Sequence, residues 1–179
     1  MRTLVVYESM FGNTAEVAHA VSEGMVHEMD VDLHEVSDAP AAITDFVDLI
    51  VLGGPTHAFS LSRPSTRADA VRQGAPTDRA TAGLREWLGG LRKGPHSELV
   101  ATFDTRVERV RHLPGSAAKK AAKLARSLGY TPVAHESFYV ADVAGPLLPG
   151  ELDRARKWGH DLAADMRARH DGRSPSRRP

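Results

Sequence analysis

The sequence predicts an α/β fold: a three-layer, doubly wound sheet of five parallel strands in the order 2-1-3-4-5. Three observations lead to this prediction. Short apolar runs alternate with stretches of helical periodicity, several of these runs lack an alternation of apolar and polar residues, and 179 residues with 41% hydrophobic content suffice for one domain with a sizeable core. Apolar runs without such alternation are typical of parallel strands that are covered on both faces.

Five segments carry the strand signal. Leu4–Tyr7, Val47–Leu52 and Leu99–Phe103 are apolar runs without the alternation of a half-exposed strand, which suits central strands. Val31–Val36 alternates between apolar and polar residues, as expected of a strand nearer an edge of the sheet. Phe138–Val143 supplies the fifth strand, which is interrupted by polar residues.

Helical spacing of apolar residues separates these strands, and we expect a helix after each of them. Right-handed crossovers leave few topologies for such a chain, and 2-1-3-4-5 is the usual order at this size. The helical stripes are Val17, Val21 and Met25; Leu84, Trp87, Leu88 and Leu91; Ala117, Ala121, Leu124 and Leu128; and Leu152, Ala155, Leu162 and Met166.

The chain divides into one domain, 1–169, and a short tail. Residues 170–179 carry no apolar side chain, which predicts a disordered basic C-terminal tail. Residues 63–83 are rich in Pro, Gly, Ala and Arg, which predicts a loop with a short helical turn. Whether this insert covers the binding site is left open by the sequence.

The composition excludes several kinds of function. The chain has no cysteine, so disulfide bonds, thiolate zinc sites and a cysteine nucleophile are ruled out. No apolar run approaches the roughly 18 residues that span a bilayer and no signal peptide pattern is present, so we expect a cytoplasmic protein. Residues 1–60 carry one basic and ten acidic side chains, whereas 61–179 carry 22 basic and 13 acidic ones. Because this basic excess lacks interleaved aromatic residues, we expect no nucleic-acid partner.

The sequence lacks the key residues of several protein classes that share this kind of fold. A response regulator would need a phosphoacceptor Asp at the end of the third strand, where Leu52-Gly53-Gly54 stands instead. The sequence has no Gly-Lys-Ser/Thr loop, no Gly-x-Ser-x-Gly elbow and no His-Glu-x-x-His spacing among its nine histidines. We therefore expect neither a nucleotide hydrolase, nor a serine hydrolase, nor a metal site.

The first strand leads into a segment that predicts an anion site. A β-branched run ends in Ser9-Met10-Phe11-Gly12-Asn13-Thr14, and an amphipathic helix begins at once. Free backbone N–H groups and the positive end of the helix dipole would favour an anion there. The plainer alternative is a capped helix start, because Asn13 followed by Glu16 fits a capping box, and the two interpretations use the same geometry.

Three loops together resemble the flavin-binding loops of the flavodoxin family. They are Ser9–Thr14, Gly53–Phe59 and Thr102–Arg106, and the resemblance covers roughly residues 2 to 166. It implies a flavodoxin-like fold and an FMN cofactor. In the first loop it implies that Ser9 and Thr14 offer hydroxyls to the FMN phosphate, that Gly12 lets the backbone approach and that Asn13 adds its amide. The backbone N–H groups of Met10, Phe11 and Asn13 would complete the cradle, although Phe11 stands where the family usually has a hydroxyl.

The resemblance also implies contacts with the flavin ring in the other two loops. Pro55 would stiffen the second turn, Thr56 would bond the flavin edge, and His57 or Phe59 would stack on the ring. The predicted ring contacts are Pro55, Thr56, His57, Ala58 and Phe59 in the second loop and Phe103, Asp104, Thr105 and Arg106 in the third. The third loop lacks the Tyr that many flavodoxins place there.

The third loop is basic, which bears on the redox potential. Arg106, Arg109 and Arg111 would place positive charge near the flavin, and a nearby cation favours the negative charge of the reduced ring. We therefore expect a less reducing flavin than in an acidic flavodoxin.

Three functions remain open from the sequence. The favoured one is an electron carrier that binds FMN and serves redox partner proteins. The alternatives are an enzyme similar to the NAD(P)H:quinone reductases, with a small quinone-like acceptor, or to the flavodoxin-like protoporphyrinogen oxidases, and a scaffold that binds no flavin. The sequence carries no nicotinamide fingerprint, which favours the carrier. It does not indicate the oligomeric state.

Overall fold

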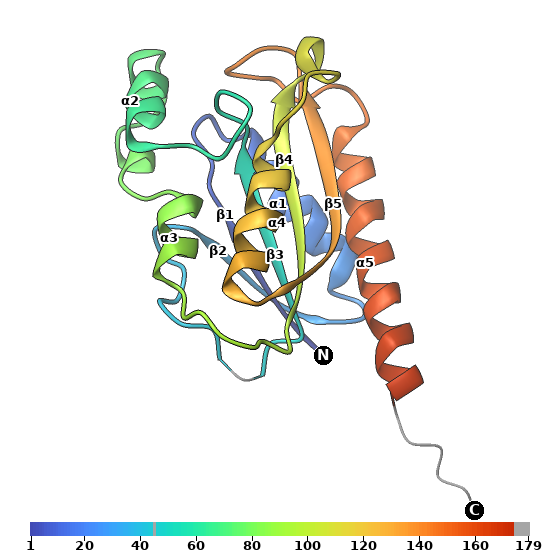
Figure 1. Ribbon diagram of the computed structural model, residues 1–179. Coiled ribbons are helices and arrows are strands. Elements are labelled where there is room, and N and C mark those ends of the chain that lie inside the picture. Colours follow the sequence, from blue (N-terminus) through green and yellow to red (C-terminus); the bar gives the residue numbers. More distant parts are fainter. Residues whose placement is uncertain (45, 174–179) are drawn as a thin grey trace, which may run out of the picture.

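Five parallel strands form one sheet at the centre of the molecule in the computed structural model, which describes residues 1–44 and 46–173 (Figure 1). The strand order is β2-β1-β3-β4-β5 and each neighbouring pair is parallel, which confirms the predicted topology. The strands are β1 (Arg2–Tyr7), β2 (Asp30–Glu35), β3 (Leu49–Pro55), β4 (Leu99–Val107) and β5 (Thr131–Val140).

Helices cover both faces of the sheet, so the molecule has three layers (Figure 1). On one face lie α1 (Asn13–Met25) and α5 (Glu151–Arg173), and on the other lie α3 (Leu84–Gly90) and α4 (Ala117–Leu128). A further helix, α2 (Pro64–Arg72), and the short 3-10 helices η1 (Asp78–Ala80) and η2 (Glu108–Val110) belong to the connections. Within the described residues, no helix is long and apolar enough to cross a membrane.

The core consists of two apolar clusters, one on each side of the sheet. Successive strand residues point to opposite faces, so Val5 packs toward α1 and α5 while Leu4 and Val6 pack toward α3 and α4. In β3, Val51 and Leu52 divide in the same way. Burial on both faces explains why these strands appear in the sequence as apolar runs without alternation.

Two glycines hold α1 tightly against α5. A Cβ on Gly24 would lie 2.1 Å from the carbonyl oxygen of Arg156, and a Cβ on Gly159 would lie 2.1 Å from that of Val21. Larger residues at either position would force the helices apart. This close crossing fixes α1, and the N-terminus of α1 forms part of the site described below.

Two predictions about the strands and their connections were wrong. No helix follows β2 in the described part of the β2–β3 connection, where Trp87 of α3 instead donates a hydrogen bond from Nε1 to the carbonyl oxygen of Pro40 at 2.9 Å. The fifth strand begins at Thr131, not at Phe138, and ends at Val140. The start of this strand was missed because β5 is an edge strand whose first half is only partly buried. Its apolar signal is therefore confined to the end near Phe138.

The structure also corrects the predicted insert and tail. The insert contains the nine-residue helix α2, which begins with Pro64 and is stabilised by a hydrogen bond from the N–H of Arg63 to Oγ1 of Thr66 at 2.9 Å. The helix α5 continues to Arg173, so the first residues of the predicted disordered tail are helical. The rest of that tail, 174–179, lies outside the described residues.

Candidate cofactor site

A cavity of about 300 Å³ opens at the carboxyl ends of β1, β3 and β4, the edge at which doubly wound sheets bind ligands. Ten of the fifteen residues predicted from the sequence line it, namely Met10, Phe11, Asn13, Thr14, Pro55, Thr56, His57, Ala58, Thr105 and Arg106. The other five, Ser9, Gly12, Phe59, Phe103 and Asp104, do not. Among the described residues, no group of three or more His, Asp or Glu side chains is placed to hold a metal ion.

The first loop turns sharply between β1 and α1. Gly12, the residue before α1, has a φ of 98°, a left-handed conformation that residues with a Cβ rarely adopt. The hydroxyl oxygen of Ser9 accepts hydrogen bonds from the N–H groups of Gly12 and Ala15, both at 3.2 Å. Ser9 therefore shapes the loop instead of lining the cavity.

Four cavity-lining residues of this turn have backbone N–H groups that donate to no acceptor among the described residues. They are Met10, Phe11, Asn13 and Thr14. The helix α1 has 13 residues, so its N-terminus carries the positive end of a substantial dipole. A cation is also near, because a Cβ built on Gly12 would lie 3.8 Å from Nη1 of Arg79. These groups form a positive surface rich in donors, which suits an anion.

Side chains of the first loop tie it to its neighbours. The hydroxyls of Thr14 and Thr105 are hydrogen-bonded at 2.7 Å, which joins the start of α1 to the end of β4. The side-chain amide of Asn13 donates to the carbonyl oxygen of Ala144 at 3.1 Å, beyond the end of β5. Loops that lie far apart in the sequence are thereby joined into one rim around the cavity.

The second loop leaves β3 at Pro55 and stays attached to β4 and α4. The N–H of Thr56 donates to the carbonyl oxygen of Thr105 at 2.9 Å, while Oγ1 of Thr56 accepts from the N–H of Ala117 at 2.9 Å. The threonine hydroxyl thus satisfies a free N–H at the start of α4. The backbone of Pro55 and Thr56 is consequently fixed in the cavity wall.

A tight turn follows at His57–Ser60. Two backbone hydrogen bonds of 2.9 and 3.0 Å join His57 and Ser60, and the two residues between them, Ala58 and Phe59, have φ of 47° and 61°. Burial lowers the pKa of His57, so its imidazole is neutral at pH 7 and presents a flat, uncharged ring to the cavity. Phe59 is 46% exposed at the turn and does not line the cavity, so only His57 of the two predicted stacking residues lines it.

The left-handed turn leads to a prediction about stability. Replacing Ala58 with glycine is expected to raise the free energy of unfolding by about 0.5–1 kcal/mol, because glycine adopts positive φ without steric cost. Ala41→Gly is a matched control in an exposed loop without positive φ and should lower it by a similar amount. Urea unfolding measures both. Destabilisation by Ala58→Gly would contradict the prediction.

The third predicted loop is the end of strand β4, which runs to Val107. Phe103 is buried in the core, with its ring centroid 6.1 Å from those of Phe138 and Trp158. Asp104 is buried too, and its Oδ2 accepts a hydrogen bond from the N–H of Ala118 at 2.8 Å. Phe103 and Asp104 thus have structural roles and do not line the cavity, although they were predicted to contact the flavin.

Arg106 is the cation of this segment that lines the cavity. It is only 6% exposed, and its Nη2 donates to the carbonyl oxygens of Val110 at 2.6 Å and Leu113 at 3.2 Å. Its Nε has no hydrogen-bond partner, and in the described part of the chain no carboxylate lies within ion-pair distance of it. Arg109 and Arg111, by contrast, are exposed and paired with Asp142 and Glu108. Of the three arginines predicted to place positive charge near the flavin, Arg106 is therefore the one that brings an unpaired charge to the cavity among the described residues.

No protein-family model matches the chain, and no curated protein sequence does so. Solved structures do match. A flavodoxin from the domain Archaea is 19% identical, with a TM-score of 0.60 over 93% of this chain and 99% of that one. A flavodoxin from Streptococcus pneumoniae TIGR4 is 17% identical, with a TM-score of 0.62 over 92% and 99% of the two chains. This chain has the flavodoxin fold. A flavodoxin-like WrbA-like protein from Agrobacterium tumefaciens also matches, at 21% identity and a TM-score of 0.55 over 93% and 98% of the two chains.

The insert forms a fourth wall of the cavity in this flavodoxin fold. Thr66, Asp69, Ala70 and Gln73 of the α2 segment line the cavity, although no sequence signal had placed them there. Met10 and Phe11 of the first loop pack against an apolar cluster that includes Ala70. The sequence of α2 has no pronounced apolar stripe, so its position beside the cavity could not be predicted from helical periodicity.

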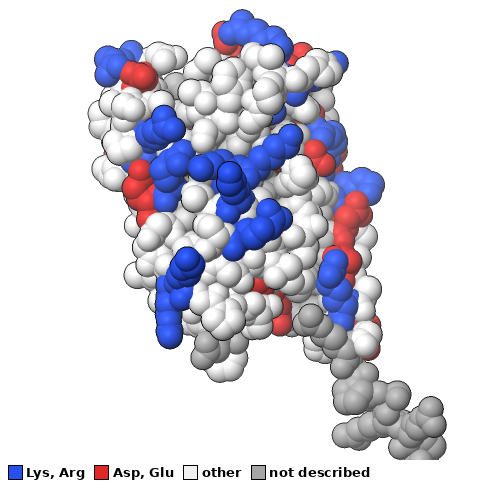
Figure 2. Space-filling model, in the orientation of Figure 1, with Lys and Arg blue, Asp and Glu red and all other residues white. Residues whose placement is uncertain are grey.

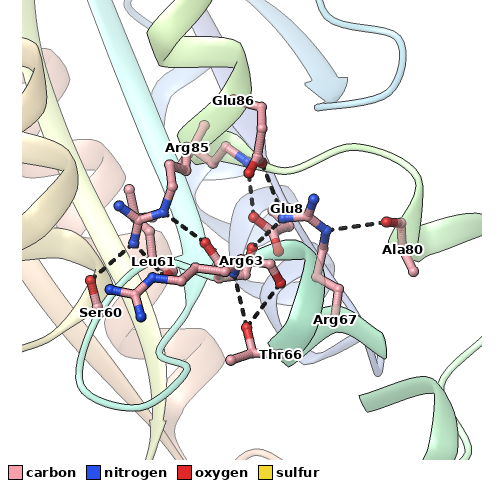
Figure 3. A network of polar contacts seen from close by, with 11 residues as sticks. Glu8, Ser60, Leu61, Arg63, Thr66, Arg67, Ala80, Arg85 and Glu86 are labelled. Atoms are coloured by element: carbon pink, nitrogen blue, oxygen red, sulfur yellow. Dashed lines mark hydrogen bonds and ion pairs between the residues drawn. The ribbon is translucent and has the colours of Figure 1, made fainter. Parts of the chain in front are cut away.

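A buried polar network holds the insert in place (Figure 3). Arg67 is 3% exposed and donates to the carbonyl oxygen of Ala80 at 3.1 Å, to Oγ of Ser62 at 2.9 Å and to Oε2 of Glu86 at 3.1 Å. Glu8, which directly follows β1, lies in the same network and accepts a hydrogen bond from the N–H of Leu84 at 2.9 Å. The network thus joins the start of the first loop to α2 and α3.

The Glu8 carboxyl gives a prediction about pH. Burial raises its pKa above 4.5, although hydrogen bonds from Ser62 and Leu84 act in the opposite direction. The folded state therefore favours the neutral carboxyl. The stability that this preference contributes is fully present below pH 4.5 and is lost as the pH rises through the raised pKa of the folded state. The stability of the wild-type protein should fall relative to that of Glu8→Gln as the pH rises above 4.5. Urea unfolding across this range measures the difference, and a constant difference would contradict the prediction.

Proposed function

We propose that the chain binds FMN in this cavity and carries electrons between redox partners. The observation that supports this most strongly is the first loop, where four N–H groups without acceptors surround the left-handed Gly12 at the start of α1. Such a loop stabilises a phosphate through hydrogen bonds and the helix dipole. The flavodoxin fold of the chain and the position of the loop beside the cavity are consistent with a phosphorylated flavin.

The residues of the cavity fit the two parts of FMN. The phosphate would be held by the N–H groups of Met10, Phe11, Asn13 and Thr14, with the charge of Arg79 nearby. The ring system would lie between the end of β4 at 105–107 and the cavity wall formed by 55–58, which includes the neutral His57. When bound, FMN supplies reversible uptake of one or two electrons.

Phe11 departs from the flavodoxin pattern in a way that the structure explains. It stands where a phosphate-binding hydroxyl is usual, but its ring packs against the apolar cluster of Met10, Ala70 and Ala75. The position therefore attaches the loop to the insert instead of providing a hydroxyl. Arg79, from the same insert, supplies positive charge beside Gly12.

A carrier is favoured over a reductase because the sequence has no nicotinamide fingerprint. The experiment has two parts. Protein purified with added FMN should show flavin absorbance at one flavin per chain, and a colourless product would contradict the proposal. The loaded protein should then oxidise NAD(P)H only slowly with a quinone and no partner protein. Rapid turnover would indicate a reductase instead.

A further inference from the structure

The face formed by α3 and α4 carries a concentration of positive charge (Figure 2). We define it as the basic face. Lys119, Lys123 and Arg126 follow the spacing i, i+4, i+7 on α4, so they lie along one side of that helix, while Ala117, Ala121 and Ala125 are buried on the other. Its residues are Arg85, Arg92, Lys93, Lys119, Lys120, Lys123 and Arg126.

Helix packing and a backbone hydrogen bond bring these residues onto one surface. The helices α3 and α4 pack beside each other, and the N–H of Gly94 donates to the carbonyl oxygen of Leu128 at 3.0 Å. This hydrogen bond holds the segment that contains Arg92 and Lys93 against the end of α4. The basic face therefore extends along α4 and across to α3.

The charges of the basic face are not neutralised by neighbouring carboxylates. Within 1–44 and 46–173, none of its seven residues forms an ion pair, and α4 contains no acidic residue. The helix α5 on the opposite layer is different, because five of its basic residues each pair with a carboxylate, namely Arg154, Arg156, Lys157, Arg167 and Arg169. An unpaired positive face favours association with a negative surface.

The basic face adjoins the mouth of the cavity. The N–H of Ala117, the first residue of α4, donates to Oγ1 of Thr56 in the cavity wall. Beside it lie two exposed apolar side chains, Phe59 at 46% and Leu113 at 48% exposure. A Cβ on Gly115 would lie 2.7 Å from the carbonyl oxygen of Phe59, so these two loops are in contact. Apolar residues next to a charged surface are characteristic of a protein–protein interface.

We propose that the basic face, with Phe59 and Leu113, is the docking surface for an acidic redox protein. This inference rests on the proposed function, because docking here would bring the partner to the cavity that holds the cofactor. The helix α4 is packed on the sheet along its length and has no aromatic residue, which disfavours insertion into a nucleic-acid groove or base stacking. Opposite charges would increase the association rate, and salt would reduce it.

The test uses an acidic [2Fe–2S] ferredoxin and flavin-free protein. We expect calorimetric affinity for the ferredoxin to fall at least about tenfold between low salt and about 0.5 M salt. The double substitution Lys119→Glu with Lys123→Glu should weaken binding to a similar extent, and the corresponding Gln substitutions should have about half that effect in free energy. The matched control, Lys157→Glu with Arg169→Glu, has the same charge change on α5 and should leave the affinity within about twofold.

Amide shifts in an NMR titration provide the second readout. Shifts confined to α4 and the loops of Phe59 and Leu113 would support the inference, whereas shifts centred on α5 would overturn it. Unchanged affinity in the Lys119→Glu, Lys123→Glu variant would also overturn it, as would a DNA duplex or phosphatidylserine vesicles that bind more tightly than ferredoxin through the same lysines. These titrations need no flavin, so a failure of docking is distinguishable from a failure to bind FMN.

Discussion

Gly12→Val is expected to weaken FMN binding by at least about 100-fold, while riboflavin, which lacks the phosphate, loses much less affinity. Gly12 has a φ of 98°, which a β-branched residue does not tolerate, so the loop has to change its conformation. The N–H groups of Met10, Phe11, Asn13 and Thr14 would then no longer converge on one point. Loss of one or two charge-assisted hydrogen bonds, at about 1.5–3 kcal/mol each, accounts for the expected factor.

Gly150→Val is the matched control for this prediction. Gly150 also has a positive φ, 85°, and open space around it, but it precedes α5 and does not line the cavity. Its substitution should cost comparable stability and leave the FMN affinity within about twofold. Calorimetry with FMN and with riboflavin measures each variant. Equal losses for the two ligands in Gly12→Val would show that the loop does not bind the phosphate.

Arg106→Met is expected to lower the midpoint potential of the bound flavin by roughly 30–60 mV. A flavin gains negative charge on reduction, and the buried guanidinium of Arg106, which has no carboxylate partner among the described residues, favours that charge. An electrostatic interaction of about 1.4–2.8 kcal/mol in a partly dry site corresponds to this shift for a two-electron couple. Redox titration with a dye of known potential measures it.

Two further variants separate charge from structure at this position. Arg106→Lys loses the planar guanidinium that bonds the carbonyl oxygens of Val110 and Leu113 but keeps the charge, so it should restore most of the potential. Arg109→Met removes an exposed charge of the same segment that is paired with Asp142, and should shift the potential by less than about 10 mV. If Arg106→Lys and Arg106→Met had the same potential, the electrostatic explanation would be wrong.

Much of the fold could be predicted because the central strands are buried on both faces. Burial on both sides produces continuous apolar runs, as in Leu4–Tyr7, and the order of strands then follows from right-handed crossovers. The edge strand β5 was located only at its buried end, because its partly buried remainder carries polar residues such as His135 and Glu136. The first loop was recognisable because its geometry depends on residue types, above all on Gly12.

The rest of the site depends on contacts that leave no periodic pattern. The prediction placed Phe103 and Asp104 in a flavin-binding loop, but β4 continues past both residues and places them in the interior. The buried hydrogen bonds of Arg67 fix the position of α2 in the cavity wall. The segment that contains α2 has few apolar residues, so its sequence does not reveal these contacts. Among three neighbouring arginines, only the structure distinguishes the buried Arg106 from the exposed, paired Arg109.

A crystal structure of the protein grown with FMN is the most direct test of flavin binding in this cavity. We predict a phosphate at the N-terminus of α1, with its oxygens about 3 Å from the N–H nitrogens of Met10, Phe11, Asn13 and Thr14. We also predict that the ring lies between the loop of His57 and the end of β4 at Arg106. A phosphate bound elsewhere, or a cavity without flavin in crystals grown with saturating FMN, would contradict it.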